Sequence, residues 1–170
     1  IKKLSESSGH SGIAGGQYLD LNFENKKISQ KKITDMEIKK TGKLFAFCCE
    51  SAGIIKKISY KKRNMLKKIG LDIGLLFQIT DDLIDYKGDA KIVGKPTRRD
   101  ENKGKQTLIN LMGYNKTLTF VNNLKKKITK NIKKANEHKR SFLTGSTRSV
   151  HGCWANWILL QPYYERIRGK

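Results

Sequence analysis

Apolar side chains recur every three or four residues along one long segment of the chain, residues 61–86. They are Leu66, Ile69, Ile73, Leu76, Phe77 and Leu83. This spacing places them on one side of an α-helix. The only prolines are Pro96 and Pro162, so little interrupts helix formation elsewhere. No stretch alternates polar and apolar residues as a half-buried strand does, and we therefore predict an all-α fold.

Four other segments also favour helices. They are residues 4–21, which are rich in glycine and alanine, residues 34–55, residues 107–112 and the amphipathic stretch 116–135. Thr34 followed three residues later by Glu37 predicts a capping box at the start of the second segment. The small side chains of the first segment should let another helix approach closely. Residues 87–105 contain Gly88, Gly94 and Pro96 and are expected to form a loop.

The length of 170 residues is that of one domain or a piece of one. No apolar run approaches the roughly 18 residues that a membrane span needs. The first residues, Ile1 to Leu4, contain neither an initiator Met nor a secretion signal. Three cysteines, two of them adjacent, make a disulfide framework improbable. We therefore expect a cytoplasmic protein without a membrane span, and a chain that begins inside a longer one.

Lysine and arginine give the chain a formal net charge of +21. Such a charge attracts polyanions. However, the excess is mostly lysine, spread along the chain among many Ile and Asn residues, a pattern that an AT-rich coding sequence also produces. Lysines without interleaved aromatic residues are weak evidence for reading nucleic-acid bases, and we predict no nucleic-acid partner.

The composition changes after Lys139. Residues 141–169 contain no lysine and a single acid, Glu165. We therefore divide the chain into residues 1–139 and an atypical tail, residues 140–170. The tail is either a separate module or a stretch foreign to the original reading frame, and we favour the second interpretation.

Three carboxylates stand together within the longest predicted helix: Asp81, Asp82 and Asp85. They share an arc of about 100° with Gln78, among apolar neighbours. Clustered carboxylates repel one another and are expensive to bury, unless a divalent cation joins them. Mg²⁺ takes one or two carboxylates together with substrate phosphates. The pattern predicts a magnesium site, although a solvated acidic patch near a helix end remains the alternative.

Three lysines could face these carboxylates. Lys40 begins a Lys-Thr-Gly sequence within a predicted helix, whereas Lys95 and Lys105 each follow a glycine in or after the loop. A lysine beside a glycine reaches a phosphate easily because the backbone there is unencumbered. Each lysine alone is more typical of a surface residue. Together with the carboxylates they predict a site for a magnesium-bridged diphosphate.

Four motifs in order carry a resemblance to a known family. They are Gly15-Gly16-Gln17-x-x-Asp20-Leu21, Lys40-Thr41-Gly42-x-Leu44, Gly74-Leu75-Leu76-Phe77-Gln78-x-x-Asp81-Asp82-x-x-Asp85, and Gly88-Asp89 with Gly94-Lys95. In this order and spacing the chain resembles the C-terminal half of a trans-polyprenyl diphosphate synthase, most closely the bacterial farnesyl diphosphate synthases. The resemblance covers about residues 4–113. It implies part of an isoprenoid-synthase-type helical bundle with a central cavity, and a homodimer when full length.

The resemblance also implies a reaction. An allylic diphosphate, such as dimethylallyl or geranyl diphosphate, would ionise with the help of Mg²⁺ and condense with isopentenyl diphosphate. The implied metal residues are Asp81, Asp82 and Asp85. The implied catalytic and substrate-binding residues are Lys40, Thr41, Gln78 and Lys95, with Lys105 and Gln17 as further substrate-binding residues and Asp20 lining the cavity.

The chain departs from the family in three ways, one of which is a C-terminal segment unlike the family's ending. The family's first aspartate-rich motif and the basic residues that bind isopentenyl diphosphate lie upstream of the part represented here. Arg98 stands where the family often has a glycine. We therefore expect a fragment of a prenyltransferase. The alternative is a non-catalytic basic helical module, either a regulatory subunit or a polyanion binder.

Overall fold

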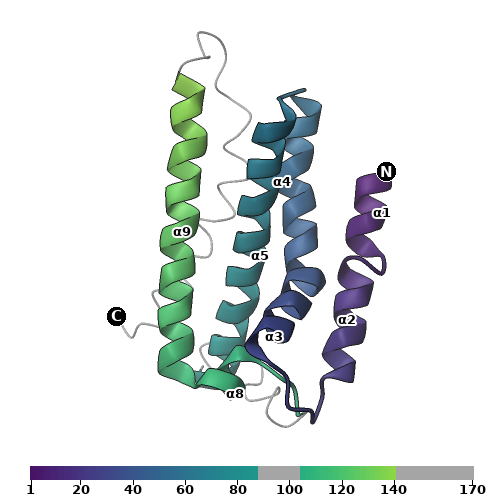
Figure 1. Cartoon of the computed structure of the whole chain (residues 1–170), viewed down its shortest axis with the longest axis vertical. Helices are drawn as coiled ribbons and strands as arrows, with labels where there is room; N and C mark the ends of the chain where they lie inside the picture. Colours follow the sequence, from purple (N-terminus) through teal and green to yellow (C-terminus); the bar gives the residue numbers. More distant parts are fainter. Residues whose placement is uncertain (88–103, 141–170) are drawn as a thin grey trace.

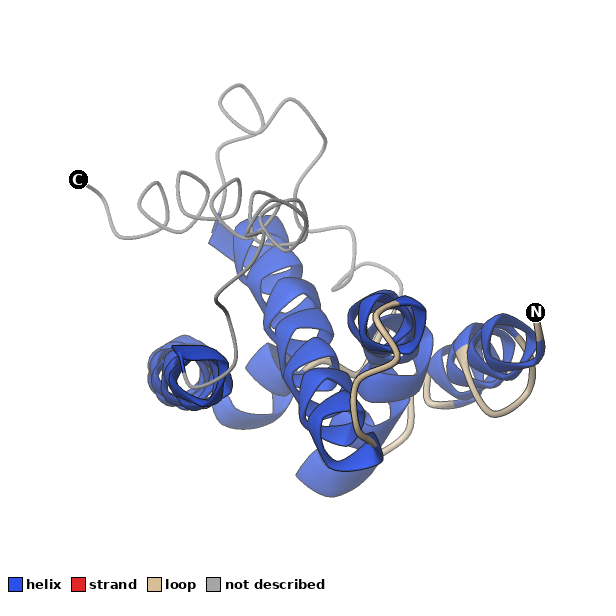
Figure 2. Ribbon diagram, turned by 90° about the horizontal axis from the view of Figure 1, so that it is seen from above, coloured by secondary structure: helices blue, strands red, loops and turns tan. Residues whose placement is uncertain are grey.

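The computed structural model describes residues 1–87 and 104–140, with side chains as far as residue 135. Every regular element in these two ranges is a helix (Figures 1 and 2), which confirms the all-α prediction. The helices are α1 (Lys2–Ser8), α2 (Ile13–Asn22), α3 (Gln30–Glu37), the π-helical segment η1 (Ile38–Gly42), α4 (Lys43–Ile55), α5 (Tyr60–Lys87), α8 (Leu108–Met112) and α9 (Tyr114–Arg140).

Helix α5 is the centre of the fold and packs between α4 and α9 (Figure 1). It begins and ends within one residue of the segment predicted from apolar spacing. Its apolar side forms one hydrophobic core with α3, α8 and α9. The buried core residues are Ile33, Met36, Leu75, Leu76, Ile79, Leu83, Leu108, Ile109, Val121, Leu124 and Ile128.

Helix α9 is amphipathic, as predicted from its sequence. Val121, Leu124 and Ile128 are buried against the core, and most of the lysines of the helix are exposed. One of these lysines, Lys127, donates to the Asp72 carboxylate of α5 at 2.8 Å. The lysines of α9 therefore lie at the surface, while its apolar stripe holds the helix in the bundle.

The second predicted helix forms, but it begins earlier than predicted. The continuous helix α3–η1–α4 starts at Gln30, after the extended residue Ser29, and ends at Ile55 as expected. The predicted capping box is therefore wrong, because Thr34 lies inside the helix and Glu37 is buried. The earlier start places Ile33, which is completely buried, within the first turn facing the core.

The single helix predicted over residues 4–21 is also wrong. The chain forms two helices, α1 and α2, separated near Gly9 and Gly12. The backbone turns so tightly there that a β-carbon on Gly12 would lie 1.8 Å from the carbonyl oxygen of Ser7. The close helix approach expected from the small residues is confirmed at Gly16, where a β-carbon would lie 2.2 Å from the backbone nitrogen of Lys40.

Two glycines of α5 allow a second close approach. A β-carbon on Gly74 would lie 2.6 Å from the α-carbon of Gly42, and one on Gly70 would lie 2.6 Å from the α-carbon of Ala46. Side chains of ordinary size at these positions would push α5 away from η1 and α4. The glycines therefore fix how near α5 comes to the Lys-Thr-Gly segment.

The predicted short helix forms as α8, whose preceding residue Thr107 accepts a hydrogen bond from the backbone of Asn110 at 3.3 Å. Most of the predicted loop at residues 87–105, with Lys95, and nearly all of the atypical tail lie outside the described residues. In the part that the structure describes, no helix is long and apolar enough to cross a membrane.

Replacing Gly74 by alanine should lower the free energy of unfolding by about 1–3 kcal/mol, because the added methyl group meets backbone atoms that cannot move aside. Urea denaturation followed by circular dichroism measures the change. Gly53→Ala is the matched control, since its β-carbon would meet only the side chains of Ile58 and Arg63. That change should stay below about 1 kcal/mol. Equal losses for the two variants would contradict the assignment of the Gly74 contact.

Candidate active site

The Lys-Thr-Gly sequence lies in η1, between α3 and α4. A π-helical segment carries one extra residue per turn and occurs frequently at functional sites. On one side of η1, the ammonium of Lys40 donates to Oδ2 of Asp20 in α2 at 2.6 Å. Asp20 is buried and the Lys40 side chain is 24% exposed, so the ammonium lies at the edge of the protein interior. A cation held there can still reach a ligand.

On the other side of η1, a chain of hydrogen bonds runs into α5. The Thr41 hydroxyl donates to Oε1 of Gln78 at 3.0 Å, and Nε2 of Gln78 donates to Oδ1 of Asp82 at 2.9 Å. Gln78 and Asp82 are one helical turn apart, as the shared arc in the sequence predicts. This chain fixes the orientation of the Asp82 carboxylate relative to Lys40 and Thr41.

Glu37 is a member of this site that the sequence analysis did not identify. It is 2% exposed, and the nearby charged residues are Asp82, Lys40 and Asp20. Burial raises the pKa of the Glu37 carboxyl well above its ordinary value; Asp82 and Asp20 raise this pKa further, whereas Lys40 lowers it. Its Oε2 atom has no hydrogen-bond partner within the part of the chain that the structure describes. An unpaired buried polar group costs about 1–3 kcal/mol.

The three predicted metal residues lie together near the end of α5. Asp82 and Asp85 are buried, and Asp81 is half-buried. Among the described residues, no three His, Cys, Asp or Glu side chains gather closely enough to hold a metal ion by themselves. The carboxylate oxygens are nevertheless the donors that Mg²⁺ prefers, and this cation commonly takes its remaining ligands from water and substrate phosphates. The residues therefore fit a magnesium ion that is shared with a phosphorylated ligand.

Of the three remaining predicted site residues, the structure describes Gln17 and Lys105. Gln17 is exposed on α2, one turn before Asp20. Lys105 is half-buried and follows Gly104, whose carbonyl accepts from the backbone of Asn25 at 3.0 Å. Lys95 lies outside the described residues. The roles of these three residues stay predictions.

An aromatic pair joins α4 and α5. The rings of Phe45 in α4 and Phe77 in α5 have centroids 5.7 Å apart, at an angle of 35°. These residues are close in sequence to Thr41 and Gln78, and Phe77 is 39% exposed. The pair therefore places partly exposed apolar surface on α4, which follows Thr41, and on α5, which carries Gln78.

Comparison with known proteins decides the family. Polyprenyl synthetase is the family that matches residues 3–144 of the chain. The chain belongs to this family. The resemblance based on the four sequence motifs is thereby confirmed, and the helical arrangement is that of an isoprenoid synthase.

Three relatives illustrate the similarity. The chain is 35% identical over 122 residues to farnesyl diphosphate synthase of Micrococcus luteus, covering 72% of this chain and 42% of that protein. It is 35% identical over 117 residues to geranylgeranyl diphosphate synthase of Saccharolobus solfataricus, covering 68% and 34%. A geranyltransferase structure from Helicobacter pylori, complexed with magnesium and isoprenyl diphosphate, matches with a TM-score of 0.72 and 25% identity, covering 99% and 50%.

The chain therefore spans half or less of the length of these relatives. All three are named as synthases or transferases, which gives no support to the alternative of a non-catalytic basic module.

The raised pKa of Glu37 predicts a specific pH dependence of stability. Because the folded protein binds this proton more tightly than the unfolded chain does, protonated Glu37 adds to the free energy of unfolding. This contribution is fully present below about pH 4.3 and is lost as the pH rises through the folded-state pKa. In Glu37→Gln this decline should be absent, so the variant should gain stability relative to the parent over that range. Urea denaturation at a series of pH values tests this, and parallel curves for the two proteins would contradict it.

Proposed function

We propose that this chain is the C-terminal part of a magnesium-dependent trans-prenyltransferase. Its substrates would be an allylic diphosphate, such as dimethylallyl or geranyl diphosphate, and isopentenyl diphosphate. The observation that supports this most is the hydrogen-bonded set of Lys40, Thr41, Gln78 and Asp82, with Asp20 bound to the lysine, on a chain of the polyprenyl synthetase family. The magnesium and isoprenyl diphosphate in the related Helicobacter pylori structure support the ligand chemistry.

The reaction would begin when the bond between the allylic carbon and the diphosphate oxygen breaks. The new carbon–carbon bond to isopentenyl diphosphate then forms, and a proton is lost from the adduct. The leaving group gains negative charge in the first step, so cations aimed at it stabilise the transition state. Bound Mg²⁺ would supply Lewis-acid stabilisation of that leaving group.

The residues of this chain would have separate roles in binding the metal and the diphosphate. Asp81, Asp82 and Asp85 would hold Mg²⁺, directly or through water, and Gln78 would orient Asp82. Lys40 would contact the diphosphate from the opposite side, with Asp20 holding its ammonium in place. Thr41 would keep Gln78 aligned through its hydroxyl. Lys95 and Lys105 are proposed as further diphosphate contacts, and Gln17 as a residue lining the same cavity.

The prenyl chain of the substrate is apolar and needs an apolar surface beside the diphosphate. The exposed parts of Phe77 and Leu44 provide such surface next to Gln78 and Thr41 in the sequence. A carbocation formed there would be kept away from water by these side chains.

We further propose that the whole enzyme is a homodimer in the cytoplasm. The family membership favours the homodimer, and the odd number of cysteines favours the cytoplasm. Residues 140–170 are proposed to contribute nothing to the catalytic site.

Changing Asp81 to alanine should lower the turnover of prenyl transfer about 10²-fold or more, as the loss of a contact to the developing charge does. The change should leave folding intact, because removing one of several clustered acids relieves repulsion. The assay uses a synthase in which this chain is joined to the amino-terminal half of the Micrococcus luteus relative. Turnover is measured at saturating Mg²⁺.

The control is Asp72→Ala on the same helix. Asp72 pairs with Lys127 on the side that faces α9, so its loss should leave turnover within about twofold of the parent, since surface ion pairs contribute little. If Asp81→Ala were as active as Asp72→Ala, the assignment of the carboxylates to magnesium would fail.

A further inference from the structure

The charge of α9 differs from that of the helices before it. Residues 102–136 contain no Asp or Glu, whereas each of the helices α1 to α5 contains at least one acid. An AT-rich coding sequence enriches lysine along the whole chain, but it does not remove the acids from one helix. The positive charge of α9 therefore has a cause beyond overall composition.

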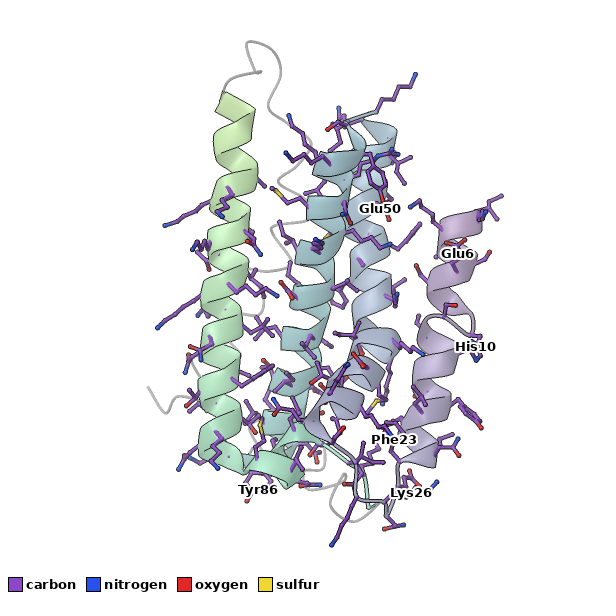
Figure 3. The ribbon with its side chains drawn as sticks, viewed as in Figure 1. Glu6, His10, Phe23, Lys26, Glu50 and Tyr86 are labelled. Carbon is purple, nitrogen blue, oxygen red and sulfur yellow. The ribbon has the colours of Figure 1, made fainter. Side chains whose placement is uncertain are left out.

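Four lysines of α9 lie together on one side of the helix. They are Lys126, Lys130, Lys133 and Lys134, called the lysine face below, and all four are exposed. Their spacing confines them to an arc of about 100°, opposite the apolar stripe that packs into the core. Helix α9 forms one edge of the bundle (Figure 1), and side chains that end in nitrogen extend from its outer side (Figure 3).

The lysine face carries an energetic cost in the folded chain. Lys130 stands four residues from both Lys126 and Lys134, and like charges at this spacing destabilise a helix. None of the four lysines pairs with an acid in the two ranges that the structure describes, whereas Lys127 pairs with Asp72 of α5. An anion bound from outside would remove this repulsion.

The same four side chains line a groove on the surface of the protein. Its volume is about 610 Å³, and its other described lining residues are Asn122, Lys125 and Thr129. This lining offers ammonium, amide and hydroxyl donors, and no acid is among the residues described there. Ammonium groups form strong, charge-assisted hydrogen bonds with phosphate oxygens. The groove therefore suits phosphate groups.

We propose that the lysine face binds the surface of an anionic phospholipid membrane. Clusters of about four to eight basic residues on an amphipathic helix are typical of segments that bind anionic lipid headgroups. The lysine face extends over about 12 Å of helix, so a flat layer of headgroups can contact all four lysines together. Because the apolar side of α9 packs into the core, the helix lies on the membrane without inserting into it.

Nucleic acid is the other polyanion with closely spaced phosphates. Proteins that bind single strands stack bases on aromatic side chains, and arginine makes the commonest specific contact to bases in duplex DNA. The described lining of the groove contains neither aromatic residues nor arginine. A membrane surface requires only positive charge, and it is therefore the partner that these residues fit.

The inference goes beyond the proposed function and does not depend on it. If the chain is part of a prenyltransferase, a membrane site has a further use, because the product would carry an apolar chain that dissolves in a bilayer.

The test is the binding of the full chain to phospholipid vesicles, measured by co-sedimentation. One set of vesicles contains equal parts of phosphatidylcholine and phosphatidylglycerol, and the other contains phosphatidylcholine alone. The parent chain should bind only the vesicles with phosphatidylglycerol. This binding should weaken as the salt concentration rises, because salt screens exposed charges.

Replacing all four lysines of the lysine face by glutamine should weaken the binding about 100-fold or more, since each lysine near an anionic surface contributes roughly fivefold. The variant should remain folded, because the substitutions remove like-charge repulsion within α9. Circular dichroism checks the fold.

A second variant with four lysine-to-glutamine changes is the matched control. It changes exposed lysines on or beside other helices: Lys31, Lys56, Lys61 and Lys68. This control loses the same net charge but keeps the lysine face. Its binding to the anionic vesicles should stay within about threefold of the parent, well below a tenfold change in the dissociation constant.

Three results would overturn the inference. The first is a parent chain that does not bind the anionic vesicles. The second is equal weakening in the two variants, since net charge alone would then attract the chain. The third comes from duplex DNA of random sequence, tested in parallel: if the parent binds it more tightly than the vesicles and only the lysine-face variant loses that binding, the partner is nucleic acid.

Two smaller variants decide the matter if the fourfold lysine-face variant does not fold. One combines Lys126→Gln with Lys130→Gln, and the other combines Lys133→Gln with Lys134→Gln. Each should weaken binding about tenfold or more, and unchanged binding in both would overturn the inference. None of these measurements involves prenyl transfer, so a failure of the proposed function would leave their result intact.

Discussion

The candidate site depends on two backbone contacts made by η1, one with α2 and one with α5. In each contact a glycine removes the side chain that would keep the helices apart: Gly16 lies against Lys40 and Gly74 against Gly42. The polar partner stands one turn after each glycine. Asp20 follows Gly16 by four residues and binds Lys40, and Gln78 follows Gly74 by four residues and binds Thr41. Because a polar residue follows each glycine by one helical turn, the close packing of the helices places Asp20 and Gln78 within hydrogen-bonding distance of η1.

Local spacing was sufficient to predict the main helices, because each of them buries one apolar face. Helix α5 has nearly the predicted boundaries for this reason, whereas α9 begins two residues earlier and ends five residues later than predicted. Local signals failed where tertiary contacts decide the conformation. The pair Thr34 and Glu37 has the sequence of a capping box, but burial of Ile33 requires the helix to begin at Gln30. The small residues before α2 permit a helix, yet the chain turns at Gly12 so that α1 and α2 can separate.

The candidate site, like the fold, could be predicted from the sequence only where local spacing decides the arrangement. Gln78 and Asp82 share a helix face, so their hydrogen bond follows from spacing alone. The pairing of Lys40 with Asp20 joins residues twenty positions apart on different helices, and only the motif resemblance placed them in one site. The sequence gives only a weak indication that Glu37 belongs to the site: it is an acid three residues before a lysine and close to core positions. Its significance comes from burial, which depends on how α2 and α5 cover η1 and cannot be read from one helix.

The distribution of charge bears on why the proposed function calls for a cation other than lysine at the site. The chain is strongly basic overall, but the described lysines of α9 are largely exposed and solvated. At the site the balance is reversed: Asp20, Asp82 and Asp85 are buried there, and Lys40 already pairs with Asp20. A diphosphate approaching these carboxylates would be repelled, because like charges at short range raise one another's energy. Divalent cations bound between carboxylate and phosphate oxygens convert that repulsion into attraction. If the ligand is a diphosphate, as proposed, the acidic site accepts it only when a metal is part of the substrate complex.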